Sequence, residues 1–457
     1  MALVLIRNAL LVATGDDRLG ELAGGDVLVD GPAIAEVGKN LNVQADRVID
    51  ADGCIVVPGF INTHHHLYQV VTRNLPKTQD AKLFDWLTYH YEVWKYLTAS
   101  EARAAMSAGI SELLLSGCTC SADHHYLCPS GIADDLFGLE AEVAAGLGIR
   151  LHMTRGSMSL GSSRGGLPPD SVVQDEDTIL TDSERVIERY HDPSRFSMCR
   201  VALAPCSPFS VSPDLMRRTA ELARRHGVRL HTHLAETLDE QEFCLERFGR
   251  RPLDYVSELG WLGDDVWFAH CVHLNDEEIK LMAATRTGVA HCPTSNLRLG
   301  SGIAPVPGML SAGVPVGLAV DGSASNDASN MLRELQITLL VHRVGTAVDA
   351  MPARTVLRMA THGGARVLGR DDIGALAPGM AADLAMFDLS GLAHAGAGHD
   401  PLGALLFCGL DYRAEMVMVN GEIVVSERHL VGHDEKTIAA DARTASQRLL
   451  KAAGVIA

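Results

Sequence analysis

Two histidines separated by one residue, His64 and His66, stand just beyond the hydrophobic run Cys54–Val57. Alternate side chains of a β-strand point to the same face, so these two imidazoles share a face and His65 lies on the other. Two imidazoles at one strand end supply half of a typical metal site. We therefore expect His64 and His66 to belong to a metal site and His65 to pack in the interior.

Further polar residues stand where later apolar runs end. They are His233 and Glu236 after the run at Leu230, His270 after Trp267–Ala269, and Asp321 after Val316–Val320. Three histidines and one aspartate can hold a divalent ion and leave a position for water, whose pKa the ion lowers toward neutrality. His231 shares a face with His233 but lies deeper in the strand, so we expect it to pack rather than to bind the ion.

The elements that carry these residues alternate between strand and helix patterns. Helices are expected over Ser212–His226, Asn275–Arg286 and Pro307–Ala312, each followed by a strand-like run. Repeated βα units over about three hundred residues indicate a parallel sheet, and its commonest closed form is a (β/α)8 TIM-like barrel. Catalytic groups of such barrels collect at the carboxyl ends of the strands, where the candidate residues stand.

Both chain ends have a different pattern, of short strands joined by turns. Leu3–Val12 and Asp26–Val37 are rich in Val, Ile and Leu, with a turn at Asp30-Gly31-Pro32, and Ala382–Asp388 and Glu415–Val424 alternate around Asn420-Gly421. We expect an α/β fold in which the two ends build one small β-sandwich domain beside the barrel. The expected bounds are 1–57 and 371–457 for the β-sandwich, with a terminal helix over Thr437–Ala453, and 58–370 for the barrel.

Composition excludes several classes of protein. The 457 residues are 47% hydrophobic, which is enough for a large core, and the formal net charge is −18. A strongly acidic chain without a basic run does not suit a nucleic-acid backbone, and no apolar run is long enough for a membrane span. The ten cysteines are scattered and no signal peptide precedes the first strand, so we expect a cytoplasmic protein with reduced thiols.

The motifs together resemble those of the amidohydrolase superfamily, and more narrowly of its nucleobase and triazine deaminase branch. They are Pro58-Gly59-Phe60-Ile61-Asn62-Thr63-His64-His65-His66, His231-Thr232-His233-Leu234-Ala235-Glu236, Ala269-His270-Cys271-Val272, Val320-Asp321-Gly322 and Ala377-Pro378-Gly379-Met380-Ala381-Ala382-Asp383-Leu384. The resemblance implies that the metal ligands are His64, His66, His233 and Asp321. It also implies acid–base roles for Glu236 and His270, with Asp321 assisting.

The number of metal ions follows from the expected fourth strand, Met198–Cys206. Binuclear relatives carry a bridging ligand there, usually a carboxylated lysine, and this segment contains neither Lys nor Glu. We expect one divalent ion, zinc by default for nitrogen and oxygen ligands, with iron(II) as the alternative. A rival cluster, Cys118, Cys120, His124, His125 and Cys128, could hold a structural zinc ion, but its spacing lacks a C-x₂-C pair. His125 or Cys128 could instead touch substrate.

The expected reaction is hydrolytic deamination of an electron-poor heterocycle. Within the branch, Gln79–Leu87, Arg155–Met158 and Ala204–Ser212 resemble bacterial 8-oxoguanine deaminases, which implies conversion of 8-oxoguanine to urate and ammonia, with isocytosine as a second substrate. Trp86 is expected to stack on the ring and Gln69 to hydrogen-bond its edge. The alternatives are an s-triazine aminohydrolase or chlorohydrolase, and an inactive barrel that serves as an assembly module. Barrels of this branch are commonly oligomers of identical chains.

Overall fold

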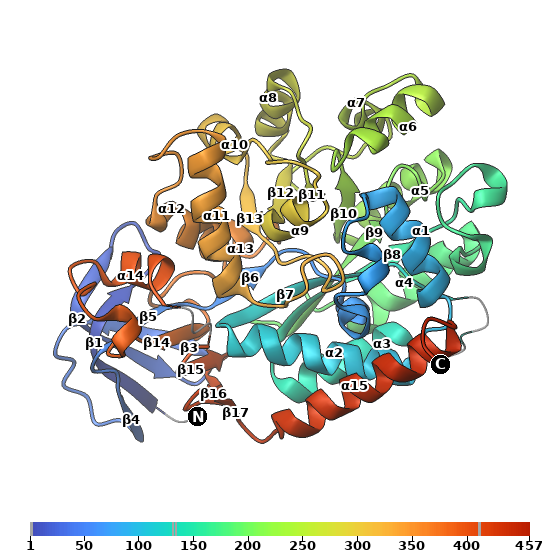
Figure 1. Cartoon of the computed structure of the whole chain (residues 1–457). Coiled ribbons are helices and arrows are strands. Elements are labelled where there is room, and N and C mark those ends of the chain that lie inside the picture. The colour runs from blue at the N-terminus through green and yellow to red at the C-terminus, as the bar shows by residue number, and fades with distance from the viewer. Residues whose placement is uncertain (1–2, 130–131, 133–134, 410–412) are drawn as a thin grey trace.

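The computed structural model describes residues 3–129, 132, 135–409 and 413–457, and it has two parts (Figure 1). A barrel ringed by helices fills the middle and right of the view. A sheet built from both chain ends lies at the left, where blue and orange-red strands run side by side. This arrangement confirms the expected α/β fold.

Eight strands form the closed barrel, in the order β10-β11-β12-β13-β6-β7-β8-β9, and every strand pair is parallel. Their bounds are β6 Phe60–Asn62, β7 Cys118–His125, β8 Arg150–Ser157, β9 Cys199–Pro205, β10 Arg229–Leu234, β11 Val266–His270, β12 Gly288–His291 and β13 Val316–Leu318. Because parallel neighbours share one direction, all their carboxyl ends open at the same rim. In chain order β9 is the fourth barrel strand, and it lies within the expected fourth strand, Met198–Cys206.

The helices follow from local signals. Helix α5 (Pro213–His226) begins after Ser212, whose hydroxyl accepts the amide of Leu215, and it ends at Gly227 with φ 66°. Helix α8 (Asp276–Thr285) begins with a capping box between Asn275 and Glu278. The other α-helices are α1 Leu83–Trp94, α2 Ala99–Leu115, α3 Leu136–Leu147, α4 Glu176–Tyr190, α6 Leu238–Phe248, α7 Pro252–Glu258, α9 Pro293–Arg298, α10 Val306–Ala312, α11 Met331–Gly345, α12 Ala353–Arg358, α13 Gly364–Val367, α14 Pro401–Phe407 and α15 Glu435–Ala452.

The strands from the chain ends hydrogen-bond into one mixed nine-stranded sheet, in the order β17-β16-β15-β14-β5-β1-β2-β3 with β4 beside β1. Their bounds are β1 Leu3–Ala13, β2 Glu21–Asp30, β3 Ala33–Gly38, β4 Arg47–Asp50, β5 Cys54–Pro58, β14 Leu384–Asp388, β15 Met416–Val419, β16 Glu422–Ser426 and β17 His429–Leu430. The turn between β15 and β16 is Asn420-Gly421, where both residues have positive φ (52° and 84°) as a type I′ turn requires. The proposed domain bounds stay a prediction.

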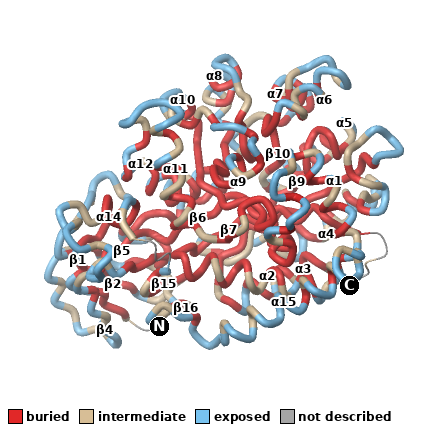
Figure 2. Tube along the Cα trace, viewed as in Figure 1, coloured by how far each residue is buried: buried red, intermediate tan, exposed pale blue. Residues whose placement is uncertain are grey.

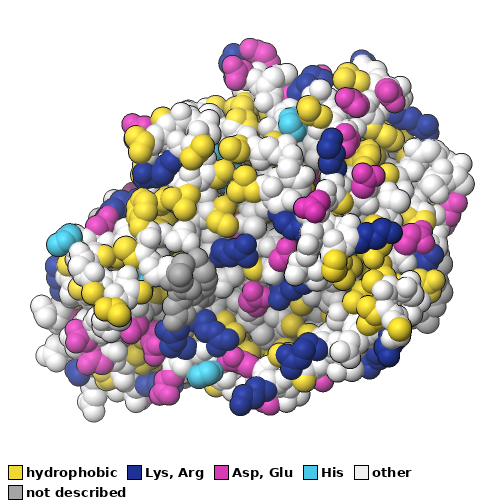
Figure 3. All heavy atoms as spheres, viewed as in Figure 1, with side chains coloured by type: hydrophobic (Ala, Val, Ile, Leu, Met, Phe, Trp, Pro, Cys, Tyr) yellow, Lys and Arg dark blue, Asp and Glu magenta, His cyan; other side chains and the backbone are white. Residues whose placement is uncertain are grey.

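A buried ion pair joins the sheet to the barrel. Arg150 at the start of β8 donates to both carboxylate oxygens of Asp383 over 2.9 and 2.8 Å, and neither side chain is exposed by more than 1%. The barrel strands are buried, whereas exposed residues lie on the outer helices, on loops and on strands of the terminal sheet such as β4 (Figure 2). On the face drawn in Figure 3, Lys and Arg side chains are interspersed with Asp and Glu. In the described ranges no helix combines the length and apolarity needed to cross a membrane.

Candidate metal centre and active site

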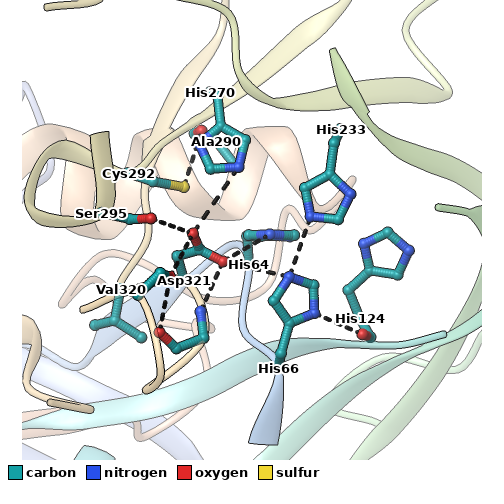
Figure 4. Close-up of polar contacts among 12 residues, drawn as sticks. His64, His66, His124, His233, His270, Ala290, Cys292, Ser295, Val320 and Asp321 are labelled. Atoms are coloured by element: carbon teal, nitrogen blue, oxygen red, sulfur yellow. Dashed lines mark hydrogen bonds and ion pairs between the residues drawn. The ribbon is translucent and has the colours of Figure 1, made fainter. Parts of the chain in front are cut away.

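The predicted ligands meet at the carboxyl rim of the barrel, although they come from three different strand ends. His66 Nε2 lies 3.1 Å from His233 Nε2 and 3.3 Å from Asp321 Oδ1, and His64 Nε2 lies 3.2 Å from the same oxygen. Figure 4 shows the imidazoles of His64, His66 and His233 turned toward one another and toward the carboxylate. Such convergence of donor atoms is what a single cation requires.

Backbone carbonyls determine which nitrogen of these rings carries a hydrogen. A carbonyl oxygen only accepts, so His66 Nδ1 donates to the carbonyl of His124 and His233 Nδ1 donates to that of Cys206, each over 2.7 Å. In a neutral ring the other nitrogen, Nε2, is then a bare lone pair. Metal-binding histidines are usually oriented in this way by a carbonyl or carboxylate.

His64 reaches the same state through a second histidine. His231 Nδ1 donates to the carbonyl of Trp267 over 2.9 Å, so His231 Nε2 accepts from His64 Nδ1 over 2.7 Å. His64 Nε2 is therefore also bare, and it is buried without a hydrogen-bond partner. His231 thus lies behind the site and orients His64, as its deeper position on the strand predicts.

The charges fit a divalent cation. Burial lowers the pKa of His64 and of His233 well below the usual histidine value, which keeps both rings neutral. Asp321 supplies the carboxylate, whose Oδ1 is the oxygen nearest to Nε2 of His64 and of His66. Three imidazoles and one carboxylate, with donor atoms facing one another at hydrogen-bond distance, are the donor set of a mononuclear zinc or iron site.

Glu236 and His270 lie beside this group. His270 Nε2 is 3.5 Å from Glu236 Oε2 and 3.9 Å from Asp321 Oδ2, and His270 Nδ1 contacts the side-chain oxygen of Asn296 at 2.8 Å. Burial, followed by repulsion from Asp321, raises the pKa of Glu236 well above its usual value. Glu236 can therefore carry a proton at neutral pH, and His270 can exchange protons with it. This arrangement can perform acid–base chemistry.

The loop after β13 holds Asp321 in a strained conformation. Its φ is 62°, in the left-handed region that non-glycine residues rarely adopt, and strain of this kind concentrates at functional sites. Ser295 and Ser325 donate to Asp321 Oδ2 over 2.5 and 3.1 Å. The next residue, Gly322, lies so close to the Gln69 amide that a Cβ atom would collide with it. The loop therefore fixes the aspartate and brings Gln69 against the site.

A small pocket lies over these groups. Its walls are His66, Gln69, Leu83, Trp86, Leu87, Tyr126, Cys206, Phe209, His233, Glu236, His270, Leu299, Asp321 and Ser325. The free volume is about 30 Å³, which is enough for about two water molecules and too little for a heterocycle. Three of the walls, Leu83, Trp86 and Leu87, belong to α1, so a ring-sized substrate fits only when α1 or a neighbouring loop moves.

Both predicted substrate contacts, Gln69 and Trp86, lie in this pocket, and both have a buried polar atom without a partner (Gln69 Oε1 and Trp86 Nε1). The prediction missed other walls, notably Tyr126, Cys206 and Phe209. Tyr126 and Cys206 directly follow β7 and β9, so the rule that located the histidines could have found them. Burial raises the pKa of the Cys206 thiol to about 12, which keeps it protonated.

The other histidines and the cysteine cluster lie outside the predicted ligand set. His65 Nε2 contacts the hydroxyl of Ser329 at 2.9 Å, away from the metal group. His124 was expected only in the cysteine cluster, yet its ring stacks on His233 with centroids 4.8 Å apart. In the described ranges, no group of donors close enough for a metal contains Cys118, Cys120 or Cys128, so the rival zinc site is not assembled. His125 and Cys128 are absent from the pocket walls, so neither touches this cavity.

Comparison with known proteins shows the family of this chain. Residues 55–424 match the amidohydrolase family. The chain belongs to that family. This amidohydrolase is 48% identical over 98% of its length to an 8-oxoguanine deaminase of Pseudomonas aeruginosa, matched over 100% of its own length. It is 36% identical, over 96% of its length and 94% of the relative, to a hydroxydechloroatrazine ethylaminohydrolase of a Pseudomonas species. The structure of an atrazine chlorohydrolase from Arthrobacter aurescens complexed with zinc superimposes with a TM-score of 0.93, at 38% identity, covering 97% of this chain and 100% of the other.

Proposed function

We propose that this amidohydrolase is a metal-dependent hydrolytic deaminase whose principal substrate is 8-oxoguanine, converted to urate and ammonia. The observation that carries the proposal is one pocket lined by His66, His233, Asp321, Glu236 and His270. His64 lies beside it, with its Nε2 3.2 Å from Asp321 Oδ1. The 48% identity to an 8-oxoguanine deaminase over nearly the whole chain supports the choice of ring.

The bare Nε2 atoms of His64, His66 and His233 and an oxygen of Asp321 would hold one divalent ion, with zinc as the first choice and iron(II) as the second. When bound, the ion supplies Lewis acidity that makes water a nucleophile at neutral pH. The carbonyls behind the histidines and the serines behind Asp321 hold the ligands in place, so little reorganisation is needed on binding.

The acid–base steps fall to Glu236, His270 and Asp321. As the water oxygen adds to the ring carbon that bears the amino group, His270, assisted by Asp321, takes its first proton. Protonated Glu236 delivers a proton to the adjacent ring nitrogen. The second proton of the water passes to the amino group, the carbon–nitrogen bond breaks, and ammonia leaves. Glu236 and His270, 3.5 Å apart, are close enough to pass protons between these positions when the site closes.

The walls of the pocket suit a planar, polar ring. Trp86, Tyr126 and Phe209 provide flat apolar surfaces, and the Gln69 amide provides an unpartnered oxygen that can accept from a ring N–H or amino group. The buried Gln69 amide discriminates strongly between substrates, because a ring that lacks the matching donor leaves the amide oxygen unpaired.

Release of ammonia from a panel of heterocycles tests the proposal. We expect turnover of 8-oxoguanine, slower turnover of isocytosine, which shares the 2-amino-4-oxo edge, and none of hydroxyatrazine. Turnover of hydroxyatrazine or a chlorotriazine without ammonia from any guanine-like base would instead support an s-triazine hydrolase, the function of relatives that share this fold. Protein that binds no divalent ion at stoichiometric level and turns over none of these rings would support an inactive barrel.

A further inference from the structure

A second group of potential ligands lies outside the active-site pocket, between strand β7 and helix α3. Asp123 and His125 sit on one face of β7, and Glu140 comes from α3. One donor atom of each lies within 4.8 Å of the others, and all three residues are completely buried. His124, between the two on the strand, faces the opposite side, toward the barrel interior, where its Nε2 contacts the carbonyl of Ala204.

Four polar atoms of this group lack a hydrogen-bond partner. Asp123 Oδ1 accepts the amide of Leu67 over 2.7 Å, but Asp123 Oδ2 and both carboxylate oxygens of Glu140 are buried without a partner. His125 Nε2 contacts the carbonyl of Leu127 at 3.0 Å and therefore carries the ring hydrogen. Its Nδ1 is consequently a bare lone pair, and it too is buried without a partner.

Among the described residues, Asp123 Oδ2 and both Glu140 oxygens have no partner, so no lysine or arginine compensates them, and a buried charge left in this state is strongly unfavourable. Something positive must therefore enter the group, either a metal cation or protons. Burial raises the pKa of Glu140 well above its usual value and that of Asp123 to about 7. At neutral pH, protons therefore compete with a metal cation for these carboxylates.

We propose that Asp123, His125 and Glu140 bind a second, structural divalent cation, distinct from the ion of the active site. Two carboxylates balance the charge of a divalent ion, and one imidazole with two carboxylates is a donor set that suits zinc or manganese. The His125 ring is already held by a backbone carbonyl in the tautomer that a metal needs. The ion ties α3 to β7 and, through the other oxygen of Asp123, to the amide of Leu67, which follows His66.

Metal content of the full chain tests this site. The protein and its variants are stripped with a chelator, reloaded with excess Zn²⁺, separated from free metal and analysed by mass spectrometry. We expect about two equivalents per unmodified chain, and about one in either His233→Ala, which loses the active-site ion, or Glu140→Gln, which loses the second ion. The matched control is Glu142→Gln on the same helix, whose side chain is 67% exposed and paired with Arg103, and it should keep both equivalents.

The alternative, a pair of carboxyl groups that share protons, gives different results. One equivalent in the unmodified chain, no metal left in His233→Ala, or unchanged metal content in Glu140→Gln would each overturn the proposal. Should Glu140→Gln fail to fold, His125→Asn removes a ligand from the strand side and is expected to lose the same equivalent. The number of metal equivalents in His233→Ala tests the second site independently of these two variants, because that substitution leaves Asp123, His125 and Glu140 intact.

Discussion

Replacing the proposed acid with its neutral isostere, Glu236→Gln, isolates proton transfer from every other function of the site. Gln fills the same volume in the pocket and preserves a polar contact toward His270, which lies 3.5 Å away, but it has no proton to deliver. Two groups of donor atoms at the site are close enough to hold a metal: His64, His66, His124 and His233, and His64, His233, His270 and Asp321. Glu236 belongs to neither, so the ion should stay bound. The variant should therefore bind metal and substrate normally and turn over very slowly.

Positioned acid–base groups contribute about 10²- to 10⁴-fold to rate, or about 3 to 5 kcal/mol in activation free energy, and we expect kcat to fall by this amount. KM should change by less than about threefold, because the substitution leaves ground-state contacts in place. Glu236 acts in its protonated form and burial raises its pKa, so kcat of the unmodified enzyme should decline as pH rises through that raised pKa. This alkaline decline should be absent from the residual activity of Glu236→Gln.

The assay measures ammonia release from 8-oxoguanine across pH, with metal content determined on the same preparations. Glu242→Gln, an exposed position on the neighbouring helix α6, is the matched control and should behave like the unmodified enzyme. Turnover retained within tenfold in Glu236→Gln would remove Glu236 from the acid–base role. Loss of the metal ion in this variant would show instead that Glu236 is a ligand, and the reasoning from the donor geometry would be refuted.

Three further outcomes follow from the same geometry. His233→Ala should lose the active-site ion and all activity, because it removes one of three bare Nε2 atoms that face Asp321; activity with metal retained would contradict its role as a ligand. Trp86→Ala should raise KM for 8-oxoguanine about 3- to 10-fold, the value of one aromatic contact, whereas Tyr96→Ala, which is 43% exposed, should leave KM unchanged. Asp372→Asn should lower the free energy of unfolding at pH 7 by at least about 2 kcal/mol, since Arg370 contacts hold the pKa of Asp372 at about 2 against 3.8 in the unfolded chain. The stabilisation by Asp372 is complete above pH 3.8 and is lost as pH falls through about 2. Urea unfolding should therefore show a smaller difference in unfolding free energy between the unmodified protein and Asp372→Asn at pH 3 than at pH 7. An equal difference at both pH values would contradict the assignment.

Local rules predicted the elements well where one signal acted alone. Ser212 and Gly227 bound α5 as N-cap and left-handed C-cap, and Asn420-Gly421 makes the hairpin turn of the terminal sheet. Local sequence signals were less informative for His124. Its neighbours on β7 suggested a cysteine cluster, but the alternation of the strand separates His124 from His125, and each faces a different layer of the fold.

The identity of the site residues could be read from the sequence because strand ends and their directions follow from local patterns, and a parallel barrel brings all carboxyl ends to one rim. The chain itself therefore specified His64, His66, His233, Glu236, His270 and Asp321 as neighbours. Only the folded structure decided the rest. The carbonyls that orient each imidazole, the walls that α1 adds to the pocket and the approach of Glu140 to Asp123 depend on how separate elements pack against one another. Such contacts join residues far apart in the chain, and no periodicity within a single element encodes them.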